Sequence, residues 1–287
     1  MSSTKIKSFC KVNLSLKVIK KLKNNYHNIK SLITFCELHD LIHINKIQGR
    51  KDIISFSGRF KKGIDPKSNT INKALELLRK NRLLKNQKFK ISIRKNIPHG
   101  SGLGGGSSNA AVLLNYFNST TKPKLSKKKI FKIASQIGSD VPISLEKKNT
   151  FLTGKKGKIL RFNKKFKFNL LIVYPNLVCS TREIYKKNRK VGLSKSQYLP
   201  FIKNKEKLIN LLKHENNDLE NVVTKMYPRV KRTIDFIKSQ KGCYFSRITG
   251  SGSACIGIFS NMKNAIYVKK KVGIKYPKYW CAISKTI

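Results

Sequence analysis

The stretch that decides the fold reads Ile97-Pro-His-Gly-Ser-Gly-Leu-Gly-Gly-Gly-Ser-Ser-Asn-Ala-Ala111. It holds five glycines and three serines between a strand-like segment, residues 89–93, and a helix-like segment, residues 109–118. Glycine allows positive φ and a close approach of the backbone to a ligand. A helix that begins at such a loop directs unpaired N–H groups and the positive end of its dipole at whatever lies there. The stretch therefore predicts a loop that binds phosphate.

Three other interpretations of the glycine-rich stretch are disfavoured. A dinucleotide fingerprint, GxGxxG, is formally present at Gly100, Gly102 and Gly105. It also needs an acidic residue about 20 positions later, and residues 122–132 contain none. A Walker A loop ends in Gly-Lys-Ser/Thr, and no lysine occurs in residues 96–118. A flexible linker would not run directly into Ala-Ala-Val-Leu-Leu, which is typical of a helix.

What remains resembles the ATP-phosphate loop of the GHMP kinases, which include galactokinase, homoserine kinase, mevalonate kinase and phosphomevalonate kinase. The matching pattern is PxGxGLGGGSSNAA, beginning at Pro98. The resemblance implies that ATP is the phosphoryl donor. It also implies that ATP is bound by Pro98, Gly100, Gly102, Leu103, Gly104, Gly105, Gly106, Ser107, Ser108 and Asn109.

The composition is that of a folded protein. Of the 287 residues, 39% are hydrophobic, with 15 Phe and 10 Tyr, which argues against disorder. No apolar run approaches the roughly 20 residues needed to span a membrane, and residues 1–30 contain no signal-peptide apolar region. The six cysteines form no CxxC pair. They are expected to be reduced and mostly buried, as in a cytoplasmic protein.

The formal net charge of +50 requires an explanation. Nucleic-acid binding is one possibility, but the lysines are spread along the whole chain, and no helix-turn-helix, zinc finger or RNP sequence accompanies them. The abundance of Lys, Asn and Ile is typical of drift in an AT-rich genome. We therefore expect a solvated basic surface, some attraction for a phosphorylated substrate, and no nucleic-acid or membrane partner.

The apolar spacing predicts separate groups of strands and helices, hence an α+β protein. Strands are expected at residues 5–18, 31–46, 89–93, 168–174, 244–248, 254–259 and 280–283. Helices are expected at residues 69–84, 109–118, 126–137, within 205–241, and at 263–272. We expect an N-terminal ATP-binding domain, residues 1–155, and a C-terminal substrate-side domain, residues 156–287. The resemblance implies the two-domain GHMP kinase fold with the active site in the interdomain cleft.

Phosphoryl transfer needs a group that receives the proton of the acceptor hydroxyl, and the chain has only 13 acidic residues to choose from. Most lie in lysine-rich helical stretches. Asp140 differs because it follows a predicted helix end at Gly138 and precedes Pro142, which fixes the next turn of backbone. An ordinary turn aspartate is the alternative. Gly-Ser-Asp-Val-Pro also resembles the segment that supplies the catalytic aspartate of several GHMP kinases.

A lysine near the N-terminus also stands out. Lys11 lies among apolar strand residues, where it either points to solvent or faces a site, because burying a charge without a partner is costly. Cys10-Lys11-Val12-Asn13-Leu14-Ser15-Leu16 resembles the opening of one GHMP branch, whose acceptor is a sugar alcohol carrying cytidine diphosphate. Further short matches follow in the same order, at residues 25–27, 175–185, 217–220 and 246–254.

This resemblance implies a role for each matching residue. Catalysis would rest on Asp140, as proton acceptor, and on Lys11, which would stabilise charge on the hydroxyl and the γ-phosphate. Asn13 would bind the sugar alcohol. His27 would bind the cytosine edge, while Tyr26 and Tyr185 stack on the base. Mg²⁺ is expected, with ligands unknown.

The activity implied is ATP-dependent phosphorylation of a hydroxyl of that cytidine diphosphate substrate, a step in isoprenoid precursor synthesis by the non-mevalonate pathway. Asn24-Asn25 departs from the usual Asp-Gly before Tyr-His, so the geometry on the cytidine side stays open. Three alternatives also stay open: a homoserine or mevalonate type of GHMP kinase, an inactive nucleotide-binding relative, and a basic nucleic-acid-binding protein. His39 and His43 are spaced four apart, as in zinc proteases, but the glutamate of that motif is absent.

Overall fold

A computed structural model describes residues 3–22, 27–153, 158–163, 166–189, 192, 202 and 204–287. The chain forms two compact units, each assembled from separated pieces. Unit 1 comprises Met1–Lys11, Leu38–His99 and Gly104–Lys147, and unit 2 comprises Val12–Glu37, Gly100–Leu103 and Lys148–Ile287. Two long paired strands, β1 (Thr4–Lys21) and β2 (His27–Ile47), contribute residues to both units.

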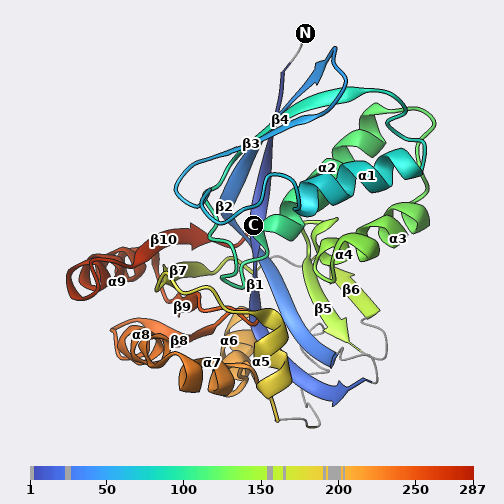
Figure 1. Ribbon diagram of the computed structural model, residues 1–287. Helices are drawn as coiled ribbons and strands as arrows, with labels where there is room; N and C mark the ends of the chain where they lie inside the picture. The colour runs from blue at the N-terminus through green and yellow to red at the C-terminus, as the bar shows by residue number, and fades with distance from the viewer. Residues whose placement is uncertain are drawn as a thin grey trace. The chain divides into compact units, whose positions relative to one another are not determined.

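Unit 1 is a sheet covered by helices (Figure 1). Its strand β4 (Lys88–Arg94) pairs antiparallel with the last residues of β2 and parallel with β3 (Ile53–Ser57). Alternate residues of β4 are buried, as the period of a half-buried strand requires. They pack against α1 (Thr70–Lys80), α2 (Gly105–Thr120) and α3 (Lys127–Ile137). The largest buried members of this core include Ile42, Ile44, Ile71, Leu75, Leu78, Phe89, Ile91, Ile93, Leu113, Leu114 and Phe117.

The helix ends of unit 1 follow local capping chemistry. Helix α3 begins after Ser126, whose side chain accepts from Lys129 N, and it ends before Gly138, which confirms the prediction. Helix α1 ends at Lys80 rather than at Leu84, because Arg82 takes a left-handed conformation at φ 59°. Helix α2 begins four residues before the predicted start, so the last two glycines and the last two serines of the loop form its first turn.

Unit 2 contains an antiparallel sheet in the order β10-β7-β9-β8. Its strands are β7 (Asn169–Tyr174), β8 (Cys243–Ile248), β9 (Cys255–Phe259) and β10 (Trp280–Lys285). The helices of this unit are α5 (Thr181–Lys187), α6 (Lys205–His214), α7 (Glu220–Met226), α8 (Pro228–Lys238) and α9 (Met262–Lys275). Helices α8 and α9 pack on the sheet through a shared apolar core (Figure 1).

The first half of β2 also belongs to unit 2. It pairs with β5 (Asn149–Thr153), which pairs with β6 (Lys158–Phe162). Both units therefore combine antiparallel strands with segregated helices, and the predicted α+β class is confirmed. All six cysteines are free thiols, four of them buried. In the part of the chain that the structure describes, no helix is long and apolar enough to cross a membrane.

Candidate active site

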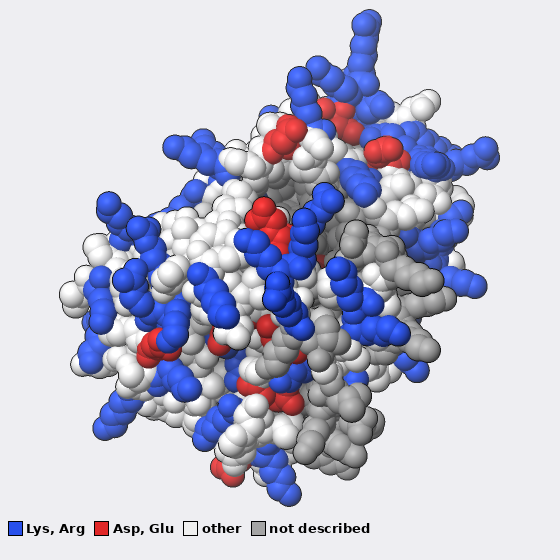
Figure 2. Space-filling view, turned by 60° about the horizontal axis from the view of Figure 1, so that its bottom comes forward, with Lys and Arg blue, Asp and Glu red and all other residues white. Residues whose placement is uncertain are grey.

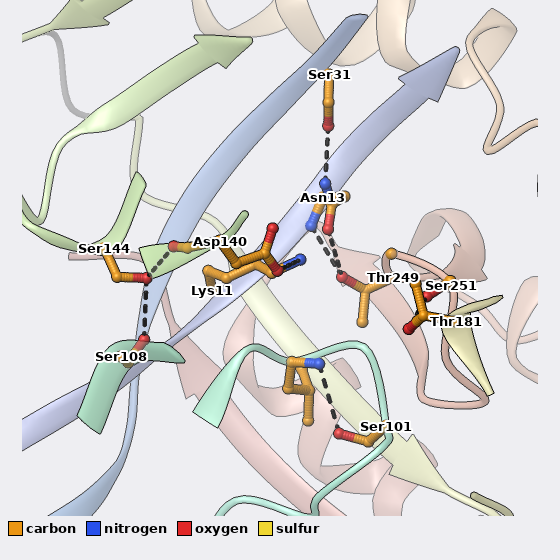
Figure 3. Close-up of polar contacts among 12 residues, drawn as sticks. Lys11, Asn13, Ser31, Ser101, Ser108, Asp140, Ser144, Thr181, Thr249 and Ser251 are labelled. Carbon is orange, nitrogen blue, oxygen red and sulfur yellow. Dashed lines mark hydrogen bonds and ion pairs between the residues drawn. The ribbon is translucent and has the colours of Figure 1, made fainter. Parts of the chain in front are cut away.

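In unit 1, a buried lysine meets a partly open carboxylate. Lys11 Nζ lies 3.1 Å from Asp140 Oδ2, and their side chains are 5% and 38% exposed (Figure 3). Asp140 precedes the short helix α4 (Val141–Ser144), but its side chain does not cap that helix. The carboxylate is therefore turned to Lys11 and stays accessible to a ligand. A buried ammonium beside a carboxylate is less costly than an isolated one.

Hydroxyl groups fix the backbone of Asp140. Its carbonyl accepts from Ser144 N at 3.2 Å and from Ser144 Oγ at 3.0 Å. The same Ser144 hydroxyl accepts from Ser108 Oγ at 3.4 Å (Figure 3). Ser108 lies in the first turn of α2, so a chain of hydroxyls connects the start of that helix to the aspartate.

The first amides of α2 have no side-chain cap. The residue before the helix is Gly104, at φ 69°, which offers no side-chain cap to the first amides. A Cβ at this position would lie 2.8 Å from Lys11 Cγ, so only glycine lets the lysine chain pass. The N–H groups of Gly105, Gly106 and Ser107 begin a 16-residue helix, whose positive end attracts phosphate.

The middle of the glycine-rich loop, residues 100–103, packs in unit 2. Gly102 has φ 89°, and a Cβ there would lie 2.0 Å from Thr249 O. Residues 250–253, Gly-Ser-Gly-Ser, form a second glycine stretch. A Cβ on Gly252 would lie 2.0 Å from the carbonyl carbon of Ser101, whose oxygen accepts from Ala254 N at 3.1 Å. The backbones of the two glycine stretches are therefore in direct contact. Glycine is needed at Gly102 and Gly252 because a side chain at either position would collide with the other stretch.

Unit 2 also orients the amide of Asn13. Its Nδ2 donates to Ser31 Oγ at 2.8 Å, and that hydroxyl donates to Ser15 O at 2.6 Å. Thr249 Oγ1 accepts from Asn13 N at 2.9 Å and donates to Asn13 Oδ1 at 3.4 Å (Figure 3). These contacts define which end of the amide is the donor. The sequence predicted Asn13 but not Ser31, which lies in no motif, and it assigned no role to Thr249, which lies in the matching segment 246–254.

Two of the three residues expected around a pyrimidine lie together in unit 2. The rings of His27 and Tyr185 are 4.9 Å apart and tilted by 34°. Burial, and secondarily the charge of Lys21, lower the pKa of His27, so its imidazole is neutral near pH 7. Tyr26 lies outside the described residues.

The segment Asn217-Asp218-Leu219-Glu220 holds unit 2 together. Asn217 Nδ2 donates to Gly250 O at 2.8 Å and to Ile248 O at 3.3 Å. Asp218 Oδ2 accepts from Val18 N at 2.9 Å. Glu220 Oε2 accepts from Ile248 N at 2.8 Å, while burial raises the pKa of this carboxyl. The segment thus holds the backbone at Ile248 and Gly250, where the second glycine stretch begins. Its sequence alone did not reveal this structural role.

Comparison with known proteins identifies the family. The model of the GHMP kinases N terminal domain matches residues 69–148, and that of the GHMP kinases C terminal domain matches residues 200–278. A 4-diphosphocytidyl-2-C-methyl-D-erythritol kinase of Pelagibacter ubique (strain HTCC1062) is 41% identical over 289 aligned residues, covering 100% of both chains. The chain belongs to the GHMP kinase family.

Other GHMP kinases agree with this assignment. The enzyme of the same name from Caldanaerobacter subterraneus subsp. tengcongensis is 34% identical, covering 99% of this chain and 96% of that one. A crystal structure of 4-(cytidine 5'-diphospho)-2C-methyl-D-erythritol kinase matches with TM-score 0.76 at 22% identity, covering 98% and 99%. Homoserine kinase from Cytophaga hutchinsonii matches with TM-score 0.72 at 14% identity, covering 100% and 95%. The predicted GHMP kinase fold is confirmed.

Among the described residues, few side chains are in position to bind a metal ion. In residues 3–22, 27–153 and the other described ranges, no group of three or more His, Cys, Asp or Glu side chains could hold a metal ion. Mg²⁺ bound to nucleotides takes most of its ligands from phosphates and water, with one or two carboxylates from protein. In unit 1, the Asp140 carboxylate and the Ser108 hydroxyl are hard oxygen donors, of the kind that would suit such an ion.

Proposed function

We propose that this GHMP kinase transfers the γ-phosphoryl group of ATP to the 2-hydroxyl of 4-diphosphocytidyl-2-C-methyl-D-erythritol, a step of the non-mevalonate isoprenoid pathway. The observation that carries the proposal is the 41% identity, over the full length, to an enzyme of that name. The fold does not choose the acceptor, because homoserine kinase matches almost as well, with TM-score 0.72 against 0.76. The full-length sequence relationship does.

The ion pair of unit 1 suits the chemical step. Asp140 would accept the proton of the acceptor hydroxyl as that oxygen bonds to the γ-phosphorus and the bond to the β-phosphate oxygen breaks, releasing ADP. Lys11 would stabilise the negative charge on the transferred group. Its position is fixed in advance by the contact with Asp140 and by the passage beside Gly104. A preorganised charge costs no rearrangement during the reaction.

The phosphates would meet the start of α2. The amides of Gly105 and Gly106 and the hydroxyl of Ser107 would supply donors to an anion at this helix N-terminus. The Ser108 hydroxyl already donates to Ser144 Oγ, so it would face the anion site only as an oxygen acceptor. Bound Mg²⁺ would neutralise phosphate charge. The other residues of the predicted ATP site, from Pro98 to Leu103, would shape the loop around the nucleotide.

On the acceptor side, Asn13 would bind the sugar alcohol with an amide whose orientation Ser31 and Thr249 already fix. Tyr185 would stack on the cytosine, and neutral His27 would present one ring nitrogen as donor and the other as acceptor to the base edge. Tyr26 is proposed for the second stacking position from the sequence alone.

The basic surface gives no support to a nucleic-acid function. On the face shown in Figure 2, the Lys and Arg side chains are scattered among neutral residues rather than gathered in one stripe. Nucleic-acid-binding proteins usually concentrate their charge on one face or helix. We therefore propose only small-molecule partners, ATP and the cytidine diphosphate substrate, and action in the cytoplasm.

Turnover of purified protein tests the proposal. The protein is incubated with ATP, Mg²⁺ and 4-diphosphocytidyl-2-C-methyl-D-erythritol, and ADP release is measured against homoserine and mevalonate as alternative acceptors. Release with the cytidine substrate alone is expected. Release with homoserine or mevalonate instead would keep the fold and overturn the acceptor. Folded protein that binds ATP but turns over none of the three would overturn the activity.

A further inference from the structure

One fully buried carboxylate lies behind the glycine-rich loop rather than in the site described above. Asp40, on β2 in unit 1, is 0% exposed. Its Oδ1 accepts from Asn96 N at 2.8 Å and from Ile97 N at 2.9 Å. Its Oδ2 accepts from Asn109 Nδ2 at 3.0 Å and is paired with Lys95 Nζ. Both oxygens are thus engaged twice, which is the condition under which a buried charge is stable.

The four donors come from the two flanks of the loop. Asn96 and Ile97 end the extended segment that follows β4, immediately before Pro98. Asn109 lies in the second turn of α2, with its side chain 2% exposed and directed at Asp40. The Asp40 carboxylate therefore binds the residues on both sides of the loop, Asn96 and Ile97 before it and Asn109 after it.

The lysine of this cluster lies beneath the helix start. A Cβ built on Gly105 would lie 3.4 Å from Lys95 Nζ and 3.0 Å from a methyl carbon of Ile97. Lys95 is 3% exposed, and its own backbone N–H donates to Ser57 O at 2.8 Å. The ammonium neutralises Asp40 and, together with Ile97, packs against the first residue of α2.

We propose that Asp40 is a positioning residue for nucleotide binding, acting through Asn96, Ile97 and Asn109 on both ends of the phosphate loop. The inference rests on the proposed function, because it takes the loop to bind ATP. A loop of flexible glycines must be ordered before its amides can converge on a phosphate, and that ordering reduces affinity. If Asp40 holds the two flanks at a fixed spacing, less conformational entropy is lost when the loop binds a phosphate. Asn109 then contributes to ATP binding through Asp40.

The test uses Asp40→Asn, Asn109→Ala and a matched control. Asp52 is a second aspartate of unit 1 with a backbone and a basic partner, although only part-buried: it accepts from Phe89 N at 2.9 Å and pairs with Arg79 at 2.7 Å, at the other end of β4. Asp52→Asn should lower the melting temperature without changing nucleotide affinity. Asp40→Asn should weaken ADP binding by calorimetry and raise KM for ATP at least tenfold, with KM for the acceptor unchanged. Hydrogen exchange at Asn96 and Ile97 should accelerate.

The outcomes separate the proposals. If Asp40→Asn and Asn109→Ala lose stability yet bind ADP as tightly as the unaltered protein, Asp40 is only structural and the inference is overturned. If Asp40→Asn does not fold, Asn109→Ala decides, with an expected threefold or greater loss of ADP affinity together with faster hydrogen exchange at Asn96 and Ile97. Lost affinity with unchanged exchange there would mean that Asn109 contacts the nucleotide directly, and the inference would be overturned. ADP binding can be measured without an acceptor, so the two proposals can fail separately. If the unaltered protein does not phosphorylate the cytidine substrate but Asp40→Asn binds ADP more weakly than it does, the positioning role is supported and the proposed acceptor is overturned.

Discussion

Lys11 Nζ and Asp140 Oδ2 lie 3.1 Å apart, with the lysine side chain 5% exposed and the aspartate side chain 38% exposed. This asymmetry matters for function. The lysine is fixed in the interior of unit 1, whereas the carboxylate keeps a surface that a ligand can reach. An ion pair built only for stability would gain little from leaving one partner open, since exposed pairs contribute weakly.

Substitutions at the ion pair should reduce turnover far more than stability. We expect Asp140→Asn to lower kcat by about 10²–10⁴, because the proton acceptor is lost. Lys11→Met should lower kcat by about 10²–10³, because charge on the transferred phosphoryl group is no longer stabilised. Steady-state ADP release gives kcat, and circular dichroism reports folding.

The exposed pair Lys231–Asp235 provides the control for these variants. Its atoms lie 2.8 Å apart on α8, and both side chains are more than half exposed. Asp235→Asn should leave kcat unchanged. Near-normal kcat in both Asp140→Asn and Lys11→Met would contradict the proposed mechanism.

The contact between the two glycine stretches should not tolerate a methyl group. Gly102→Ala places a Cβ 2.0 Å from Thr249 O at φ 89°, so the backbone must move. We expect a loss of about 1–3 kcal/mol in the free energy of unfolding, typical of overpacking, measured by urea denaturation. Gly273→Ala is the counterpart, because nothing lies within 4 Å of its Cβ position in α9. It should stabilise the protein by about 0.5–1 kcal/mol.

The opposite changes in the free energy of unfolding would contradict the packing around Gly102 and Gly273. A neutral Gly102→Ala would mean that the two glycine stretches do not touch in solution. A destabilising Gly273→Ala would mean that this part of α9 is covered or not helical.

Asn217 should be needed for stability and not for chemistry. Its side chain satisfies the carbonyls of Ile248 and Gly250 and accepts from Leu219 N at 3.0 Å, at 3% exposure. Asn217→Ala would leave these buried groups without partners, at about 1–3 kcal/mol. We expect a lower urea midpoint, and at a temperature where the variant is folded, a kcat within a few-fold of normal. A variant of unchanged midpoint would show that the network does not form.

The elements that could be predicted from the sequence are those set by local patterns, such as helix caps and alternating apolar residues. Helix α3 could be placed because Ser126 and Gly138 are unambiguous caps, and β4 because its apolar residues alternate. The sequence predicts the start of α2 four residues late, because glycine and serine are not typical of a helix's first turn. The sequence does not predict β3, because its five residues, Ile-Ile-Ser-Phe-Ser, are too few to show a clear alternation and none of them is buried; the strand is defined by its pairing with β4.

The rest of the site depends on tertiary contacts that no short motif encodes. Lys11 could be singled out by its apolar neighbours, but its pairing with Asp140 joins segments 129 positions apart, the difference between their numbers. No short motif marks Asp40, because its partners come from the two flanks of the loop, with Asn96 56 positions and Asn109 69 positions away. The units are also made of separated pieces, which composition does not mark.

His27 should make the protein less stable in mild acid. Its pKa in the folded protein lies below the ordinary value of 6.5, first because of burial and then because of Lys21. The unfolded chain therefore binds a proton before the folded chain does, so stability falls as the pH drops from about 6.5 through the folded pKa. His27→Gln removes this group. The melting temperature of the unaltered protein should thus decline more steeply between pH 7 and pH 5 than that of His27→Gln, and equal slopes would show that His27 is fully solvated.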